Sequence, residues 1–283
     1  MLVFFSVIVC IVMIVVMVQI TYGYNTLDLL SQIEPHSGAE GPLVSVVVPA
    51  CNESESIESA LRQLCRSDYS NVEIIVVDDR STDNTAAIIE SVQADFPAIR
   101  LVRVNHLPHG WLGKPHALQQ GANGAHGKYL VFVDADVRLE QTVLSRSVSA
   151  MEARGLDHLS MIFQNSSSGM LLNALIADTG AGLFFLTKPW KAKQASSRYF
   201  MGIGAFNMVQ TSAYRAIGEH RNIKDQVIDD VFLGKLIKEN GFHQECMLGE
   251  SLVTLPWYHT LPQMIDGLMK NVYAFFHYRP SYV

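Results

Sequence analysis

The first 24 residues form an almost unbroken apolar segment. Between Met1 and Val18 only Ser6 is not apolar, and the apolar character continues to about Tyr24. A helix of roughly 20 such residues spans the hydrocarbon core of a bilayer. A cleaved signal peptide is the alternative, but it requires a basic residue before a shorter apolar run and a small-residue cleavage site. No Lys or Arg precedes this run and TYGYN has no A-x-A pattern, so we predict a retained anchor.

From residue 43 onward, short apolar runs alternate with amphipathic segments. The apolar runs predict buried strands over 43–49, 72–79, 99–104 and 128–136. The segments between them predict helices over 53–66, from about 81 to 96, and from 115 to about 124. Strands that alternate with helices indicate βαβ units and an α/β fold with a mostly parallel sheet flanked by helices. Ligands of such sheets bind at the carboxyl ends of the strands.

The pattern divides the chain into a transmembrane anchor (1–24), a linker (25–42), an α/β domain (43–255) and an amphipathic C-terminal helix (256–283). Apolar positions of the last segment recur at helical spacing, at Leu261, Ile265, Leu268, Val272 and Phe275. This stripe predicts either core packing or an interfacial helix that lies on a membrane. The apolar segment 171–186 contains Asp178 and several glycines. We therefore expect a buried or interfacial helix there, and not a second span.

Composition excludes several classes of protein. The net charge of -6 and the absence of a Lys/Arg-rich run argue against a nucleic-acid partner. The four cysteines have no CxxC spacing, which argues against a disulfide framework or a structural zinc site. The histidines show no zinc-binding spacing either. We expect His106, His109 and His116 in loops or at the surface.

Two aspartates, Asp134 and Asp136, close the fourth apolar run. On an extended backbone, residues two apart project to the same side. Neighbouring carboxylates repel each other unless a cation lies between them or one is protonated, and Mg²⁺ or Mn²⁺ is held by carboxylates together with phosphate oxygens. An isolated DxD is more often a cap or a turn. Its position after the fourth buried strand instead favours a metal site.

Other polar residues follow the first and second strands. Asp78 can accept hydrogen bonds from a nucleotide base or a ribose, whereas Asp79 starts the DRSTD turn. Pro49 and Glu53 belong to the first strand-to-helix turn, in which Asn52 is expected to cap the helix.

Two further positions begin predicted helices. Lys114 follows a glycine-rich turn and precedes Pro115, which predicts an anion site without the spacing of a P-loop. Asp229 and Asp230 start the helix of VIDDVFLGKLIKENGF. They either complement the helix dipole or supply a general base, because adjacent carboxylates raise one pKa. Spacing alone favours the dipole role.

Five segments in fixed order resemble the family 2 glycosyltransferases, which have the GT-A fold: VSVVVPACNE, EIIVVDDRSTDNT, GKPHALQQGANGAHGKYLVFVDAD, GAFNMVQTSAYRAIG and DDVFLGKLIKENG. The GW-x-GK form and the YHTLPQMIDGLMKN tail are most similar to the membrane-associated branch with hopene-associated and carotenoid-type enzymes. The Q-x-x-R-W motif of processive synthases is missing, since Met264 to Gly267 follow Gln263. The resemblance therefore implies transfer of a single sugar.

The resemblance also implies roles for individual residues. Asp230 would be the catalytic base, and Asp136, with Asp134, would hold the metal. The donor side would comprise Pro49, Glu53, Asp78, Lys114 and Asp134, and the acceptor side would comprise Gly204 and Asp229. Asp229 departs from the family pattern, which has Glu there. A C-terminal histidine, His259 here, is a third metal ligand in some GT-A enzymes.

The resemblance thus implies a membrane-anchored, inverting glycosyltransferase that uses Mg²⁺ or Mn²⁺. Its donor would be a nucleotide sugar, with a UDP-sugar favoured, and its acceptor would be a lipid or a lipid-linked molecule. Its catalytic domain would face the cytoplasm, where bacterial nucleotide sugars are found. A nucleotidyltransferase of similar architecture is an alternative, although PACNESES lacks the glycine-rich, basic loop it would need. A non-catalytic, membrane-bound module is another, and the intact Asp136 and Asp230 count against it.

Overall fold

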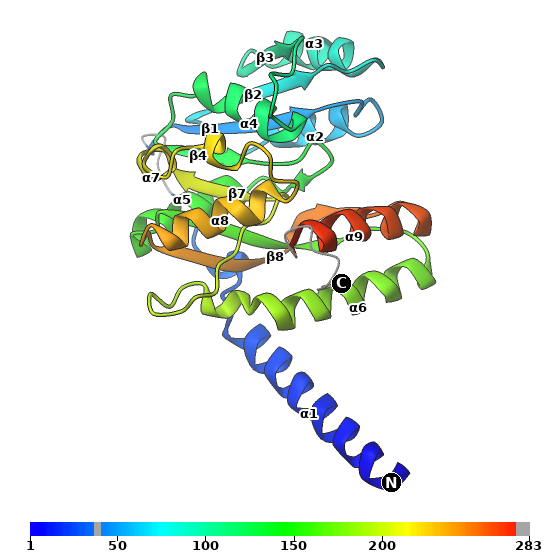
Figure 1. The fold of residues 1–283 in the computed structure, drawn as a ribbon. Coiled ribbons are helices and arrows are strands. Elements are labelled where there is room, and N and C mark those ends of the chain that lie inside the picture. Colours follow the sequence, from blue (N-terminus) through cyan, green and yellow to red (C-terminus); the bar gives the residue numbers. More distant parts are fainter. Residues whose placement is uncertain (37–40, 276–283) are drawn as a thin grey trace.

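An eight-stranded mixed sheet runs through the described part of the chain, residues 1–36 and 41–275 of a computed structural model (Figure 1). The strand order is β3-β2-β1-β4-β7-β6-β8-β5. Part of the predicted linker, 37–40, and the end of the predicted C-terminal segment, 276–283, lie outside the described residues.

The first half of the domain has the predicted strand–helix alternation. Its elements are β1 (Val44–Ala50), α2 (Ile57–Leu64), β2 (Val72–Asp79), α3 (Thr85–Asp95), β3 (Ile99–Val104), α4 (Gly113–Asn123) and β4 (Tyr129–Phe132). Strand β1 pairs in parallel with β2 and β4, and β2 pairs in parallel with β3. Because these strands run in one direction, their carboxyl ends meet at one edge of the sheet.

The second half extends the sheet with antiparallel pairings. Its strands and helices are β5 (Arg138–Leu139), α5 (Val143–Arg154), β6 (His158–Asn165), α6 (Met170–Thr187), β7 (Asn207–Gln210), α7 (Thr211–Ala216), α8 (Asp229–Glu239), β8 (Gln244–Leu255) and α9 (Leu261–Phe275), with 3₁₀ turns η1 (Leu30–Gln32), η2 (Pro189–Lys191) and η3 (His220–Ile223). Strand β7 is antiparallel to β4 and β6. The loop that precedes β7 therefore lies at the carboxyl end of β4.

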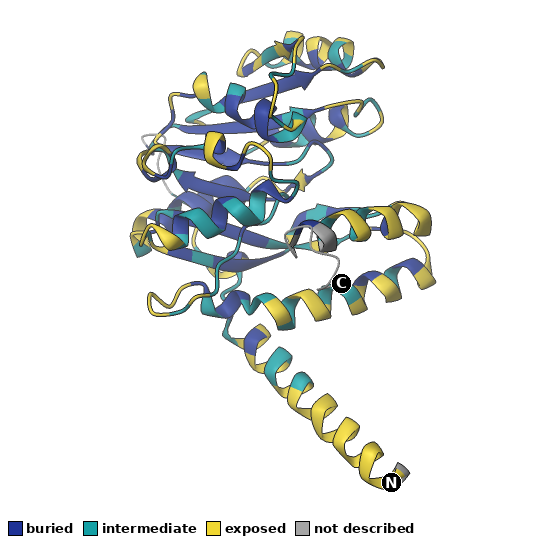
Figure 2. Cartoon of the chain, viewed as in Figure 1, coloured by how far each residue is buried: buried dark blue, intermediate teal, exposed yellow. Residues whose placement is uncertain are grey.

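Alternating side chains of the central strands are buried on both faces of the sheet (Figure 2). On β1, Val46 and Val48 belong to the core cluster that includes α2 and α3, whereas Val47 belongs to the cluster that includes α4 and α8. Each of these valines is at most 3% exposed. Full burial of such a side chain stabilises a fold by about 1.5–3 kcal/mol, which explains why unbroken β-branched runs predict these strands.

Several predicted elements have different bounds in the structure, α2 and β4 among them. Helix α2 begins at Ile57, because residues 53–56 form a turn in which the Ile57 N–H donates to the Glu53 carbonyl at 3.0 Å. The expected strand 128–136 was wrong beyond its first half, since β4 ends at Phe132. Asp134 and Val137 close a turn there, with 3.2 Å between the Val137 nitrogen and the Asp134 oxygen. The two aspartates of DxD thus lie on a turn and not on an extended strand.

Helix α1 (Leu2–Thr26) projects away from the domain and is almost wholly exposed along its outer part (Figures 1 and 2). Its end is held by Trp190, which packs so closely that a Cβ at Gly23 would lie 2.3 Å from the indole ring. Two helices in the described residues are long and apolar enough to cross a membrane, Val3–Thr26 and Met170–Lys191.

Helix α6 crosses the domain on the side from which α1 leaves, next to α9 (Figure 1). Of the two alternatives expected for this segment, a buried helix is wrong, because of its residues only Leu172 and Ile176 are buried. These two pack against Met264 of α9, and Phe184 near the other end of α6 packs against Trp190. The interfacial helix stays a prediction.

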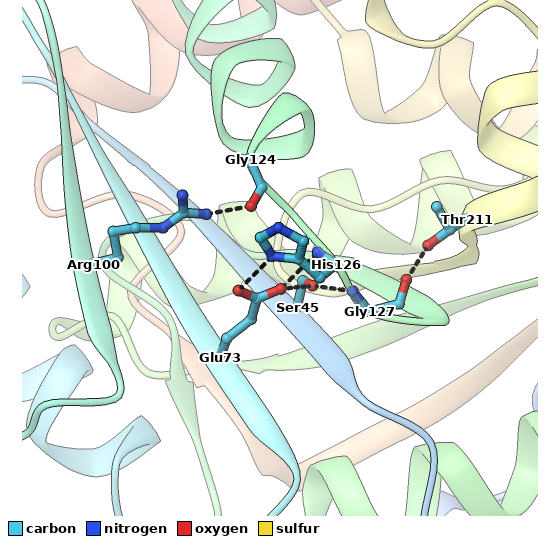
Figure 3. Close-up of polar contacts among 7 residues, drawn as sticks. All are labelled: Ser45, Glu73, Arg100, Gly124, His126, Gly127 and Thr211. Atoms are coloured by element: carbon cyan, nitrogen blue, oxygen red, sulfur yellow. Dashed lines mark hydrogen bonds and ion pairs between the residues drawn. The ribbon is translucent and has the colours of Figure 1, made fainter.

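The amino ends of β1, β2 and β4, opposite the predicted site, are joined by a polar network (Figure 3). Ser45 Oγ donates to Glu73 Oε1 at 2.6 Å and accepts from the Gly127 N–H at 2.8 Å. The His126 N–H also donates to Glu73. Burial opposes ionisation of Glu73, but the hydrogen bonds from Ser45 and His126 outweigh it and lower its pKa. The network fixes the turn before β4.

Candidate functional site

Gly204, in the loop before β7, connects the DxD turn to the start of α8. The Asp134 N–H donates to the Gly204 carbonyl at 3.1 Å, and the Gly204 N–H donates to Asp230 Oδ2 at 2.7 Å. A Cβ at position 204 would lie 2.6 Å from Asp134 Oδ2. Only glycine permits this approach, so the GIGAF segment brings together two carboxylates that are 96 residues apart in the sequence.

Lys114 pairs with Asp134 and lines a cavity together with Asp230. It lies in the first turn of α4, and its Nζ is 2.5 Å from Asp134 Oδ1. Burial lowers the pKa of Lys114, but the charges of Asp134, Asp229 and Asp230 outweigh it and raise the pKa above its ordinary value. A small cavity of about 10 Å³ lies beside the ammonium group and is lined by all four residues. The lysine therefore remains charged and compensates the acidic group.

Asp230 is half-buried at the start of α8, whereas Asp229 is buried. Burial raises the pKa of both carboxyl groups, and Lys114 opposes the rise. Asp229 was expected on the acceptor side. Its side chain is 3% exposed and its Oδ2 lies 3.9 Å from His220 Nε2, so its carboxylate faces the interior.

His220 is a member of the site that the sequence did not indicate. It lies in η3, is 1% exposed, and its Nδ1 is 2.7 Å from the Tyr214 hydroxyl. Burial, and then the charge of Lys114, lowers the pKa of His220 to about 3. The imidazole is therefore neutral, and it gives the buried Asp229 carboxyl group a polar neighbour. No spacing pattern marks this histidine, because packing of η3 against α4 and α8 buries it.

Asp136 lies on the same turn as Asp134 but is not part of the Lys114 ion pair. Burial, followed by the charges of Asp134 and Glu53, raises the pKa of Asp136 to about 6. Glu53 comes from the turn after β1, where Ser56 Oγ donates to its Oε2 at 2.9 Å. Excess negative charge thus collects at this point, where a cation would be stabilised.

The described residues contain no group of three or more His, Cys, Asp or Glu that could hold a metal ion by itself. Mg²⁺ is commonly held by one or two carboxylates together with substrate phosphates, and Asp136 with Asp134 fits that pattern. His259, the possible third ligand, belongs to no such group within the described chain.

Asp78 is the second-last residue of β2 and is 7% exposed. Its Oδ1 is buried and makes no hydrogen bond among the described residues, so an acceptor is left for a ligand. Asp79 instead pairs with Arg80, at 2.8 Å between Oδ1 and Nε. Pro49 lies in β1, beside Val77 of β2.

Two expectations about neighbouring side chains were wrong. Asn52 does not cap α2, because its Oδ1 accepts the Thr82 N–H at 2.8 Å and so joins the loops after β1 and β2. His116 is not at the surface. It is 6% exposed in α4 and meets the Trp111 ring edge-on.

The sequence profile described as Glycosyl transferase family 2 matches residues 45–215. The chain is 26% identical over 267 residues to a 4,4'-diaponeurosporenoate glycosyltransferase of Staphylococcus haemolyticus, which covers 88% of this chain and 66% of that protein. The chain thus spans just under two thirds of that relative's length. The predicted resemblance, including its carotenoid-type branch, is confirmed at this level.

Two solved structures share the fold. A mannosyltransferase, PcManGT from Pyrobaculum calidifontis in complex with GDP-Man and Mn²⁺, has a TM-score of 0.59 at 20% identity and covers 78% of this chain and 59% of that one. S. aureus TarS 1-349 in complex with UDP-GlcNAc has a TM-score of 0.56 at 16% identity and covers 79% and 61%. These similarities confirm the predicted GT-A fold.

Proposed function

The chain belongs to glycosyl transferase family 2, and on that premise we propose that it transfers a single sugar from a nucleotide-sugar donor to an acceptor hydroxyl, with inversion at the anomeric carbon. The observation that carries the proposal is the convergence of Asp134, Lys114 and Asp230 on Gly204 at the carboxyl edge of the sheet. Charged groups from three distant segments meet there, where open α/β sheets bind ligands.

Asp230 acts as the general base. The Gly204 N–H holds one carboxylate oxygen in place, and burial raises the pKa of the carboxyl group toward the range in which it can accept a proton. The acceptor hydroxyl gives its proton to Asp230, and its oxygen forms the new bond to the anomeric carbon. The bond to the nucleoside diphosphate breaks on the opposite face, so one displacement inverts the configuration.

Asp136, assisted by Asp134, would hold Mg²⁺ or Mn²⁺. Such an ion supplies positive charge that stabilises the diphosphate leaving group. Lys114 keeps Asp134 oriented and adds a fixed positive charge at the same edge of the sheet. The relative solved with GDP-Man and Mn²⁺ supports a divalent ion in this fold.

The nucleotide lies over β1 and β2 in this proposal. The unpaired Oδ1 of Asp78 accepts a hydrogen bond from the base, and Pro49 and Glu53 border the donor. A UDP-sugar is favoured, and the TarS complex with UDP-GlcNAc supports uridine recognition by this fold. In this proposal Gly204 lies between the donor and the catalytic base Asp230, on the side from which the acceptor enters.

The acceptor is a lipid or lipid-linked molecule. The anchor predicted over residues 1–24, which lies in α1, would hold the domain formed by residues 43–255 at a bilayer, with the catalytic edge facing the cytoplasm. The relative named for 4,4'-diaponeurosporenoate supports an apolar acceptor.

Asp230→Asn tests the proposed base. Donor turnover, measured as release of UDP or GDP from a panel of nucleotide sugars with Mn²⁺, should fall by at least about 100-fold, while donor binding by calorimetry remains close to wild type. Asp136→Ala should abolish the Mn²⁺-dependent binding itself. Normal turnover by Asp230→Asn would exclude this residue as the base. Release of pyrophosphate from a nucleoside triphosphate and a sugar phosphate, without release of a nucleoside diphosphate from nucleotide sugars, would favour a nucleotidyltransferase.

A further inference from the structure

A cationic segment, residues 188–198, follows α6. It contains Lys188, Lys191, Lys193 and Arg198 and no acidic residue. The acid-free stretch is longer still, since Asp178 and Glu219 are the nearest acidic residues on either side. In a chain with a net charge of -6, this is a local surplus of positive charge.

The segment is fixed to the end of α1. Trp190 lies in η2, is 5% exposed, and packs against Gly23, Leu27 and Phe184. Because Gly23 lies in the last turn of α1, the cations that flank Trp190 lie beside the point at which this helix meets the domain.

Three of the cations surround one aromatic ring. Lys188 Nζ, Lys191 Nζ and Arg198 Cζ lie 5.5, 5.7 and 5.6 Å from the centre of the Tyr199 ring. None of the three forms an ion pair with a carboxylate within the described chain, and Lys193 is 3.9 Å from Asp28. Like charges held together without a counter-charge attract an anion.

Exposed apolar side chains lie along the helix that leads into the segment and along its neighbour α9. Helix α6, which leads into it, exposes Met170, Leu171 and Leu186 by 90%, 64% and 57%, and α9 exposes Ile265 and Met269 by 51% and 68%. Figure 2 shows that both helices are exposed over much of their length. A cationic group next to exposed apolar helices and the end of a candidate span has the composition of a surface that lies at the headgroups of a bilayer.

We propose that Lys188, Lys191 and Arg198 bind the phosphodiester headgroups of anionic lipids where α1 enters the bilayer, with α6 lying along the interface. This rests on the proposed anchoring by α1. Asp178 is exposed on α6, which suits a helix in the interface and not one across the hydrocarbon. The binding would hold the domain close to the membrane, from which an apolar acceptor arrives.

The test compares the full chain with the triple variant Lys188→Gln, Lys191→Gln, Arg198→Gln. Each protein is purified from mixed micelles with equal amounts of phosphatidylglycerol and phosphatidylcholine, and the bound lipids are quantified by mass spectrometry. Each Lys or Arg near an anionic surface strengthens binding to that surface about fivefold. The ratio of phosphatidylglycerol to phosphatidylcholine should therefore fall at least about fivefold in the triple variant.

A matched control removes the same charge elsewhere. Arg103→Gln, Lys128→Gln and Lys235→Gln affect cations paired with Glu90, Glu152 and Glu239, and should leave the lipid ratio unchanged. Hydrogen exchange in nanodiscs should show slower exchange over residues 188–200 with phosphatidylglycerol than without it, in the wild type and not in the triple variant.

Equal lipid ratios in the wild type and in the variant of Lys188, Lys191 and Arg198 would overturn the proposal. An equal fall of the lipid ratio in this variant and in the control triple variant would overturn it as well. Inorganic phosphate that slows exchange over 188–200 to the same extent in phosphatidylcholine nanodiscs would assign the cations to free phosphate instead. Failure of anchoring has a different signature, because alkaline washing would then release the wild type from vesicles.

Discussion

Gly204→Ala tests whether close backbone approach is what assembles the site. The added Cβ would lie 2.6 Å from Asp134 Oδ2, and an ordinary contact begins at 3.4 Å, so the carboxylate must move by about 0.8 Å (3.4 − 2.6). The same Cβ would lie 3.3 Å from Lys114 Nζ, which limits movement on that side. The substitution therefore strains the Asp134–Lys114 pair and leaves both of its members present.

A displacement of about 1 Å can reduce the rate of an enzymatic reaction by roughly 100-fold, which corresponds to about 2.7 kcal/mol of transition-state stabilisation. We expect kcat/KM of Gly204→Ala to fall by about this factor. Overpacking also destabilises the fold, by about 1–3 kcal/mol. The predicted loss of activity is thus accompanied by a moderate loss of stability.

The assay is release of the nucleoside diphosphate under saturating Mn²⁺, at a temperature at which both proteins are folded, with stability followed by urea unfolding in detergent. Gly180→Ala is the matched control, because a Cβ at Gly180 would meet nothing within 4 Å. It should retain wild-type kcat/KM. If a folded Gly204→Ala protein turned over within about twofold of wild type, close approach at Gly204 would not govern the chemistry.

Two further predictions concern stability. His158 is fully buried, and burial lowers its pKa to about 4. As pH falls below about 6.5, this histidine therefore takes up a proton in the unfolded chain before it does so in the folded protein. The free energy of unfolding should fall by about 2 kcal/mol between pH 6.5 and 5 because of His158. Urea unfolding at both pH values should show this loss, and His158→Gln should reduce its pH dependence by about one proton; an unchanged slope would contradict it. Ser45→Ala removes the oxygen that accepts the Gly127 N–H and should cost about 1–3 kcal/mol of unfolding free energy, while the KM for the donor stays unchanged because the site is at the other edge of the sheet. An equal loss of stability on Ser31→Ala, whose hydroxyl makes only an exposed contact of 3.4 Å with Glu250, would refute the role of this network.

Much of the sheet follows from local patterns. The bounds predicted for β2 and β3 are those of the structure, because long β-branched runs fit a strand that is covered on both faces. Helix α1 follows from length and apolar composition alone. The places of Asp78 and DxD at strand ends also follow, since a parallel sheet brings such ends to one edge. The chemical roles of these residues remain predictions.

Other features depend on contacts between distant segments, and only folding creates them. The turn of DxD forms because Asp134 bonds to Gly204, 70 residues further on. Asp229 faces inward because η3 brings His220 beside it, and the cations after α6 lie at the end of α1 because Trp190 packs on Gly23. Residue periodicity reports which face of an element is buried, whereas the partner on that face is selected by the packing of the whole chain.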